Sequence, residues 1–144
     1  MDPLSITASA IAFVGVCRKL ASGFRFLKDL SRVPQDILAL ADELDDLQNT
    51  LIAVSLVTRR RRDEFLEVLL SPLLKKVDEI FGELCALCGA CSRRLKAEED
   101  YAEQLKILLA RFKWTQAKSR VGHLRERLKI VRLDFANQLA AATL

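Results

Sequence analysis

Apolar residues recur along this chain in alternating steps of three and four positions, the spacing of one buried stripe on an α-helix. Four such series predict four helices: one over about residues 4–30, one over 34–58, one that starts at Ser71–Pro72, and one through 114–135. The series are Ile6, Ala10, Phe13, Cys17, Leu20, Phe24 and Leu27; Val33, Ile37, Leu40, Leu44, Leu47, Leu51 and Val54; Leu73, Val77, Ile80, Leu84, Leu87 and Cys91; and Trp114, Ala117, Val121, Leu124, Leu128, Val131 and Phe135. No segment alternates with the period of two that a half-buried β-strand requires. The chain is therefore predicted to be all-α.

Stripes with a mean spacing of about 3.5 residues pack helices nearly antiparallel, so we expect an up-down four-helix bundle. The third helix has a clear start signal, because Ser71 supplies an N-cap hydroxyl and Pro72 suits the first helical position. The connection before it has room for a short extra helix over Asp63–Leu70. The last helix begins near Ala102 or near Trp114, and the pattern leaves both starts open.

The composition indicates a single domain over residues 1–144. Hydrophobic residues make up 51% of the chain and charged residues 29%, the balance of a globular protein whose core needs no disulfides. The chain stops inside the helical sequence Leu139–Leu144, so we expect it to be the N-terminal part of a longer protein. Its apolar N-terminus lacks the basic start of a secretory signal, which favours a cytoplasmic location.

Charge is divided unevenly between the predicted helices. Residues 32–58 hold one basic and five acidic residues, a net charge of −4. Residues 102–144 hold nine basic and three acidic residues, a net charge of +6. One interpretation is that the two segments form complementary solvated helix faces. The other is that the basic segment binds anionic lipid or an acidic protein.

Cys85, Cys88 and Cys91 form the most metal-like pattern in the sequence. Steps of three on a helix spread the thiols over about 120° of arc. A structural zinc site needs a fourth ligand, and the single histidine, His123, would have to come from another helix. The residues around the thiols are small: Gly82, Ala86, Gly89 and Ala90. We therefore predict a small-residue face for close helix packing, with no metal or cofactor, and keep metal binding or redox sensing as the less favoured alternative.

No motif in the sequence supplies enzyme chemistry. With one histidine and no glycine-rich phosphate loop, the chain has no material for a catalytic triad or a nucleotide site, and we predict no catalytic residues. The run Arg59–Arg62 suits the negative end of a helix macrodipole in a solvated turn. Lipid phosphate binding and nuclear import are the alternatives. Nucleic acid is not expected as a partner, because the net charge is only +4 and aromatic residues are few.

The first helix carries the strongest functional signal. It has no charged residue between Pro3 and Cys17, and a second apolar stripe runs beside the core stripe until Arg18–Lys19. This second stripe consists of Leu4, Ala8, Ile11 and Val14. A helix that is apolar on all sides is either buried or in contact with lipid. The fourteen uncharged residues 4–17 would span about 21 Å, less than a bilayer core of about 30 Å, so we expect insertion only after the bundle opens and copies assemble.

The opening residues Met1–Ala12, MDPLSITASAIA, closely resemble the start of the fungal N-terminal domain of STAND proteins. These HeLo-like domains are also named after the N-terminal domain of an azaphilone pigments biosynthesis cluster protein. Three further segments are similar in kind: Leu30–Leu51, Pro72–Lys75 and Phe112–Trp114. The resemblance extends over essentially the whole chain, and the opening motif is its specific part.

The resemblance implies a four-helix effector domain of a fungal immune-type receptor or amyloid-signalling protein. Such domains are linked to programmed cell death, heterokaryon incompatibility and innate immunity, and related bundles occur in other cell-death proteins. Triggered by a C-terminal module or a separate partner protein, they form homo-oligomers and attack the plasma membrane through the N-terminal helix. In this chain, the resemblance and the apolar first helix together give these membrane-interacting residues: Leu4, Ile6, Ile11, Phe13, Val14, Arg18 and Lys19.

Two classes of function follow from the sequence. A membrane-targeting effector that moves from the cytoplasm to anionic lipids is favoured by the apolar first helix, its basic flank and the family resemblance. A helical adaptor that binds only other proteins is favoured by the regular heptads and by the acidic second helix.

Overall fold

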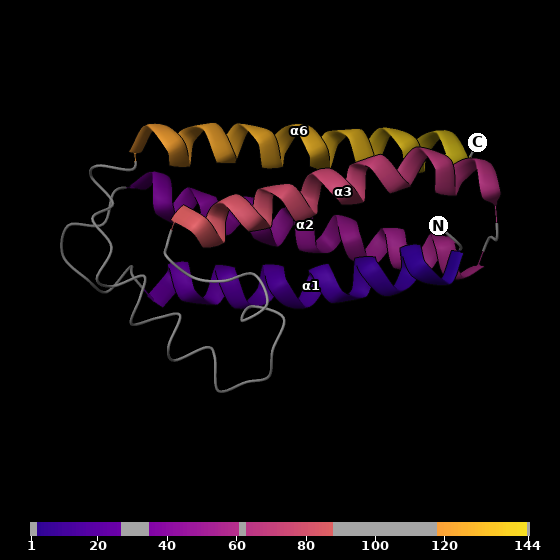
Figure 1. Cartoon of the computed structure of the whole chain (residues 1–144), viewed down its shortest axis with the longest axis horizontal. Coiled ribbons are helices and arrows are strands. Elements are labelled where there is room, and N and C mark those ends of the chain that lie inside the picture. The colour runs from indigo at the N-terminus through magenta and orange to yellow at the C-terminus, as the bar shows by residue number, and fades with distance from the viewer. Residues whose placement is uncertain (1–2, 27–34, 61–62, 88–117, 144) are drawn as a thin grey trace.

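Four long helices make up the part of the chain that the computed structural model describes (Figure 1). The described residues are 3–26, 35–60, 63–87 and 118–143. The helices are α1 (Pro3–Phe26), α2 (Gln35–Arg60), α3 (Glu64–Leu87) and α6 (Lys118–Thr143). These ranges contain no β-strand, and the predicted all-α four-helix bundle is confirmed for them. The start of the last helix, predicted near Ala102 or Trp114, lies outside the described residues.

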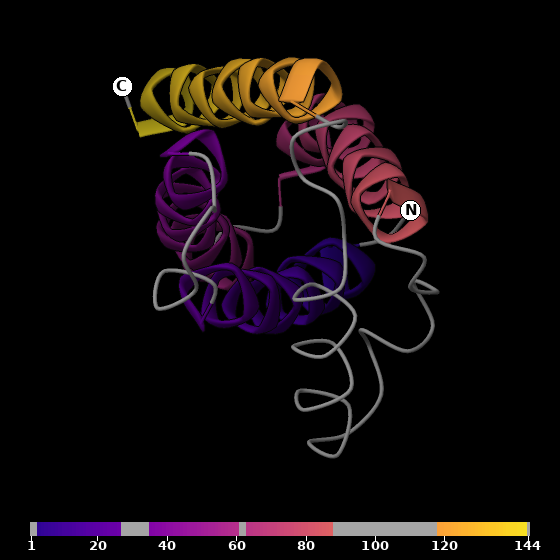
Figure 2. The same cartoon turned by 90° about the vertical axis from the view of Figure 1, so that its left-hand side faces the viewer.

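Viewed end-on, the helices surround the core in the order α1, α2, α6 and α3 (Figure 2). Successive helices alternate in direction, so α1 is antiparallel to α2 and α3 is antiparallel to α6 (Figure 1). The other two neighbouring pairs, α2 with α6 and α1 with α3, run parallel. The expectation of antiparallel neighbours is therefore right for two pairs and wrong for two. The cause is that α3 lies diagonally across the core from α2 instead of beside it.

The predicted apolar stripes face the core. Every stripe residue whose side chain is described is buried, from Ile6 on α1 to Phe135 on α6. The remaining stripe positions lie outside the described side chains: Leu27, Val33, Ile37, Leu87, Cys91, Trp114 and Ala117. The rings of Phe13 and Phe81 meet edge to face between α1 and α3, with centroids 5.4 Å apart. Aromatic pairs in this geometry stabilise a core beyond the area that they bury.

The start of α3 corrects the prediction from Ser71–Pro72. The helix begins at Glu64 and runs through Pro72, so the suggested short helix over 63–70 is its first part. Leu66 and Leu70 are buried and extend the stripe across the proline, and this burial outweighs the backbone hydrogen bond that proline cannot donate. Pro72 itself is exposed, on a side of the helix where water can satisfy the carbonyl left without a partner.

Asp63 supplies the N-cap of α3. Its Oδ1 accepts hydrogen bonds from the backbone N–H groups of Phe65 (3.0 Å) and Leu66 (3.4 Å). The carbonyl of Asp63 accepts the first helical bond from the N–H of Glu67 at 3.1 Å. An aspartate in this position satisfies donors that the first turn would otherwise leave unpaired.

Asp63→Ala is expected to lower the free energy of unfolding by about 0.5–2 kcal/mol, because two N–H groups lose their acceptor. Asp63→Asn is the matched control, since its amide oxygen can still cap the helix. A thermal melt followed by circular dichroism measures both changes. An alanine variant that melts with the parent would contradict this assignment of the helix start.

Candidate functional site

The predicted membrane-interacting residues of α1 are divided between the core and the surface. Ile6 and Phe13 are buried in the bundle. Ile11 is 47% exposed, and Val14 is partly buried against the core. Arg18 is exposed, Lys19 is partly exposed, and the side chain of Leu4 lies outside the described residues. The closed bundle therefore presents only part of the predicted set to a partner.

Polar contacts fix how α1 lies along α2. Near one end, the Oγ1 atoms of Thr7 and Thr58 are hydrogen-bonded at 2.7 Å. Near the other end, Arg25 forms ion pairs with Asp45 and, at 3.4 Å, with Asp42. Since the helices are antiparallel, this register places the middle of α1, around Ile11, beside the last turns of α2.

Sequence reasoning missed two exposed residues on this part of α2. Ile52 is 38% exposed and Leu56 is 46% exposed, and they lie one helical turn apart. Ile52 and Leu56 follow Asp45 by seven and eleven positions, which puts them on the face of α2 that Arg25 of α1 contacts. Ile11 lies one turn after Thr7, on the face of α1 that contacts Thr58. This helix geometry places three exposed residues on one surface, which we call the seam patch: Ile11, Ile52 and Leu56. The available signal was an apolar i, i+4 pair outside the core stripe of α2.

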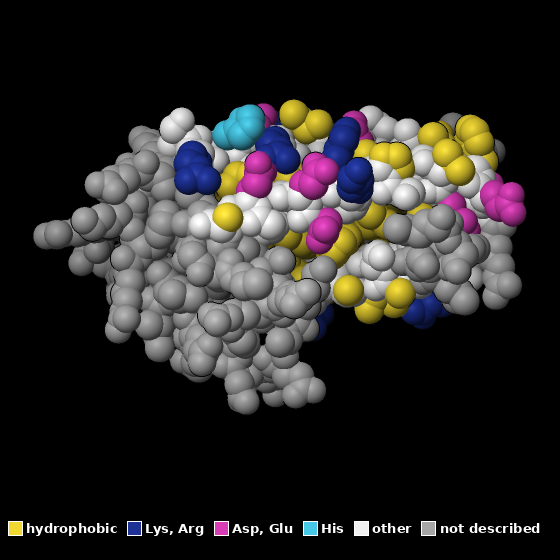
Figure 3. All heavy atoms as spheres, viewed as in Figure 1, with side chains coloured by type: hydrophobic (Ala, Val, Ile, Leu, Met, Phe, Trp, Pro, Cys, Tyr) yellow, Lys and Arg dark blue, Asp and Glu magenta, His cyan; other side chains and the backbone are white. Residues whose placement is uncertain are grey.

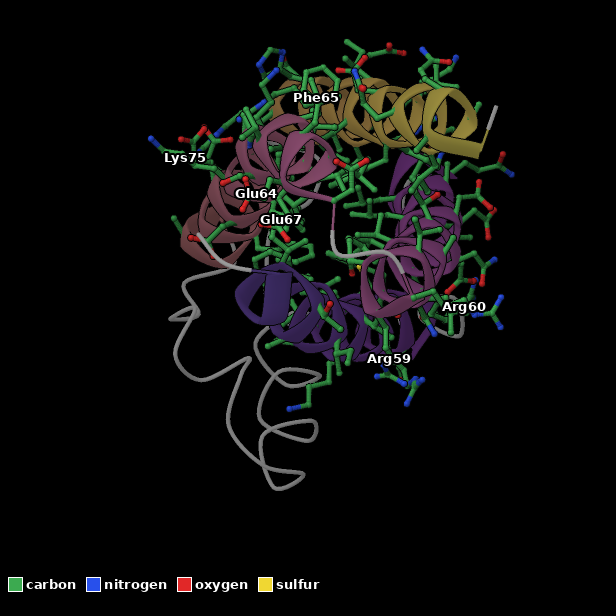
Figure 4. All side chains as sticks on the ribbon, turned by 90° about the vertical axis from the view of Figure 1, so that its right-hand side faces the viewer. Arg59, Arg60, Glu64, Phe65, Glu67 and Lys75 are labelled. Carbon is green, nitrogen blue, oxygen red and sulfur yellow. The ribbon has the colours of Figure 1, made fainter. Side chains whose placement is uncertain are left out.

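Basic residues flank the seam patch on both of the described helices that form it. No acidic residue occurs between Pro3 and Lys28 or between Leu47 and Arg62. Arg18 and Arg59 are exposed, on the two helices that form the patch. Figure 4 shows Arg59 at the outer edge between α1 and α2, with Arg60 pointing away from the bundle. An apolar surface that is bordered by cations suits a partner with an anionic surface and an apolar interior.

Within the described helices, one stretch is long and apolar enough to cross a bilayer by length and composition. It is Ile6–Arg25, with a mean hydropathy of 1.2, and half of it is buried inside the bundle. It is longer than the uncharged segment 4–17 because it includes Arg18 and Lys19. Core helices of soluble proteins have the same properties, so the stretch alone does not assign a membrane role.

α1 packs much more extensively on α2 than on α3, so the α1/α3 interface is the weaker of the two. A groove of about 690 Å³ separates parts of α1 and α3, lined by residues that include Ser9, Ala12, Leu74 and Asp78. Glu67, on α3, is buried and points into the bundle (Figure 4), and its Oε1 has no hydrogen-bond partner among the described residues. A buried carboxylate oxygen without a partner destabilises the packing around it.

Ion pairs join α6 to both of its neighbours, α2 and α3. Arg132 of α6 lies 3.6 Å from Glu43 of α2, and Arg127 of α6 pairs with Glu83 of α3. The first pair links the basic and acidic segments of the sequence, as expected for complementary helix faces. The Arg127–Glu83 pair is partly exposed and contributes about 1 kcal/mol or less, whereas the Oε2 atom of Glu43 is buried.

The guanidinium of Arg25 is charged at the end of the α1/α2 interface, and its hydrogen bond to Asp45 is the largest cause of a pKa raised further above the ordinary value.

Cys17, the cysteine whose side chain the structure describes, is buried and is not a reactive site. Burial, with a smaller effect from Asp45, raises the pKa of Cys17 to about 12, so this thiol stays protonated and packs as an apolar group. The side chains of Cys85, Cys88 and Cys91 lie outside the described residues. His123 is exposed on α6, and the described residues contain no group of three or more potential metal ligands.

The predicted small-residue face is wrong at the two positions that the structure describes. A Cβ atom at Gly82 would meet nothing within 4 Å, and Ala86 is exposed. Neither residue is therefore required for a close approach between helices. Gly89 and Ala90 lie outside the described residues.

Taken with the fold, these observations define a helical bundle whose candidate site is an exposed surface on two adjoining helices. Comparisons of the chain with protein-family models, with curated proteins and with solved structures found no match. The resemblance of the opening residues to the fungal domains remains an expectation, and the exposed surface on α1 and α2 is the structural feature that points to a function.

Proposed function

We propose that this chain is a non-enzymatic, membrane-targeting effector domain that binds anionic lipid, oligomerises and permeabilises membranes in regulated cell death. The main support is the exposure of Ile11, 47%, in the middle of a helix segment that carries no acidic residue. A large apolar side chain gains about 1.5–3 kcal/mol when it moves fully from water to an apolar phase, and Ile11 retains about half of its surface for such a transfer.

Basic side chains add to this attraction. Arg18 and Lys19 follow directly after the uncharged segment of α1, at a depth that suits the phosphate layer of a bilayer. Each basic residue near an anionic surface contributes about 1 kcal/mol. One domain would therefore bind weakly, and several domains in one oligomer would bind much more tightly, because each additional contact becomes intramolecular.

The core residues of α1 require a further step. Ile6 and Phe13 are buried in the closed bundle, so they contact lipid only when α1 separates from part of the core. The partly filled interface with α3 and the unpaired Glu67 oxygen make that side the easier one to open. A C-terminal module or a separate partner protein would trigger this opening.

Vesicle leakage tests the proposal. Purified domain is expected to release dye from vesicles that contain phosphatidylserine and to leave pure phosphatidylcholine vesicles intact. Arg18→Glu combined with Lys19→Glu should weaken vesicle binding and leakage, and the difference from the parent should be largest at low salt, where screening is weakest.

Arg120→Glu is the matched control, because Arg120 is an exposed cation on α6, away from α1. This variant should release dye nearly as the parent does. A parent protein that releases no dye from either type of vesicle, even when oligomerised, would overturn the proposed function.

The second candidate function is that of an adaptor, and exposed apolar residues on the other pair of helices favour it. Phe65 and Val68 of α3 and Ile130 and Leu133 of α6 are exposed. Figure 3 shows apolar side chains gathered on these helices, at the upper right of the view. Surfaces of this kind also bind proteins. Absence of leakage, combined with a defined protein complex that Phe65→Glu disrupts, would establish this alternative.

A further inference from the structure

The α1/α2 interface is the best-connected interface of α1. It combines extensive packing, the Thr7–Thr58 hydrogen bond and the ion pairs of Arg25. The α1/α3 interface includes the 690 Å³ groove instead. The surface of α1 on the side of Thr7, Ile11 and Arg25 is therefore shared with α2.

We infer that α1 and α2 contact an anionic bilayer together, as a paired unit, through the seam patch Ile11, Ile52 and Leu56 with Arg18 and Arg59 on either side. This inference rests on the proposed function and adds the residues of α2 to the lipid-contacting surface. It also gives an order of events, in which the closed bundle binds lipid before any helix separates from it.

The placement of charge along the two helices supports lipid as the partner. Arg18 follows Ile11 by two helical turns toward the end of α1, about 10 Å away. Arg59 follows Leu56 by about one turn toward the end of α2, which is the opposite direction in space because the helices are antiparallel. The apolar residues therefore lie between two cations, and both cations can reach lipid phosphates while the apolar residues enter the acyl boundary.

A second copy of the chain fits the same surface poorly. In a symmetric dimer each seam patch would face another, which would bring Arg18 and Arg59 of one copy close to the same cations of the other. Neither acid-free stretch supplies an acidic residue to compensate. Lipid phosphates supply the opposite charge without this repulsion.

Substitutions on α2 separate this inference from binding by α1 alone. Leu56→Glu and Ile11→Glu are each expected to lower the affinity for vesicles of equal parts phosphatidylserine and phosphatidylcholine by about tenfold or more, since each removes apolar surface and adds a negative charge. Ile130→Glu is the control, because Ile130 is 55% exposed on α6, and it should change the affinity less than about twofold. Sedimentation of the vesicles with bound protein measures the affinity.

The outcomes of this experiment are distinct. If Leu56→Glu folds and binds as the parent does while Ile11→Glu does not bind, α1 acts alone; the inference fails and the proposed function stands. If the parent binds no vesicles, the proposed function fails. If all three variants lose affinity equally, the patch has no special role and the inference fails.

A disulfide between the two helices gives a second test. The Thr7 and Thr58 Oγ1 atoms lie 2.7 Å apart, so Thr7→Cys with Thr58→Cys places two thiols within reach of a disulfide bond. The oxidised protein is expected to bind the same vesicles within about twofold of its reduced form, because the paired helices need not separate in order to bind. Loss of binding on oxidation, restored by reductant, would show that α1 must leave α2 and would overturn the inference.

A gain of affinity in a variant that keeps the parent's melting temperature provides a check in the opposite direction. Gly15 lies one turn after Ile11, and a Cβ atom there would meet nothing within 4 Å. Gly15→Ala should therefore fit the closed bundle, add apolar surface and raise the vesicle affinity modestly, by about twofold or more. An unchanged affinity in this folded variant would contradict the placement of the lipid-contacting surface.

Discussion

Leu44→Asp is expected to prevent the domain from folding. Leu44 is fully buried on the core side of α2, and a carboxylate there would lose its hydration without gaining a partner. The milder Leu44→Ala should lower the free energy of unfolding by about 2–5 kcal/mol, the usual cost of a cavity at a closed core site, and Leu124→Ala on α6 should act similarly. Far-ultraviolet circular dichroism and thermal melts measure all three.

Asn49→Asp is the control for the added charge, because Asn49 is exposed on the same helix. It should fold and melt within about 0.5 kcal/mol of the parent in unfolding free energy. A Leu44→Asp protein with the parent's helicity and melting temperature would mean that the core side of α2 has been misassigned.

Ile11→Glu should abolish dye release from anionic vesicles, and killing when expressed in cells, with little change in the melting temperature. Ile11 is about half exposed, so a glutamate there remains hydrated in the closed bundle. At a membrane the same carboxylate would have to approach the acyl chains and the lipid phosphates, and both contacts are unfavourable. Leakage assays and melts on one preparation compare the two effects.

Ile6→Glu gives the contrasting result, because Ile6 is fully buried on the same helix and its replacement should unfold the bundle. If Ile11→Glu also unfolds the protein, the second stripe of α1 belongs to the core and the adaptor function gains support. If Ile11→Glu folds and still permeabilises vesicles, α1 is not the inserting element.

The buried positions could be predicted from the sequence because burial repeats with the period of the helix. Each apolar stripe can be recognised from the sequence of its own helix, without knowledge of the neighbouring helices. The structure buries three examples: Leu40, Leu51 and Val77. The continuation of α3 through Pro72 could not be predicted in this way. Ser71 and Pro72 are typical of a helix start, but the burial of Leu66 and Leu70 stabilises a helix that begins earlier.

The seam patch was missed for a different reason. The patch depends on which helices are neighbours, and the apolar stripe of one helix does not indicate which other helix packs against it. The net charge of residues 32–58 was also misleading, because it averages over the two halves of the helix. All five acidic residues lie at or before Asp46, and the half that contains Ile52 and Leu56 has none. The lipid-contacting role itself remains a prediction.

Because α2 and α3 occupy opposite corners of the ring, the short connection between them joins helices that are not packing neighbours. α2 packs instead on α6, which comes much later in the chain, and closing such a distant contact costs more chain entropy than closing α1 on α2. During synthesis the α1–α2 pair can therefore form first, with α3 and α6 added to it later. We expect this order of helices to fold more slowly than a bundle in which each helix packs on the next, because more of its contacts are distant in sequence.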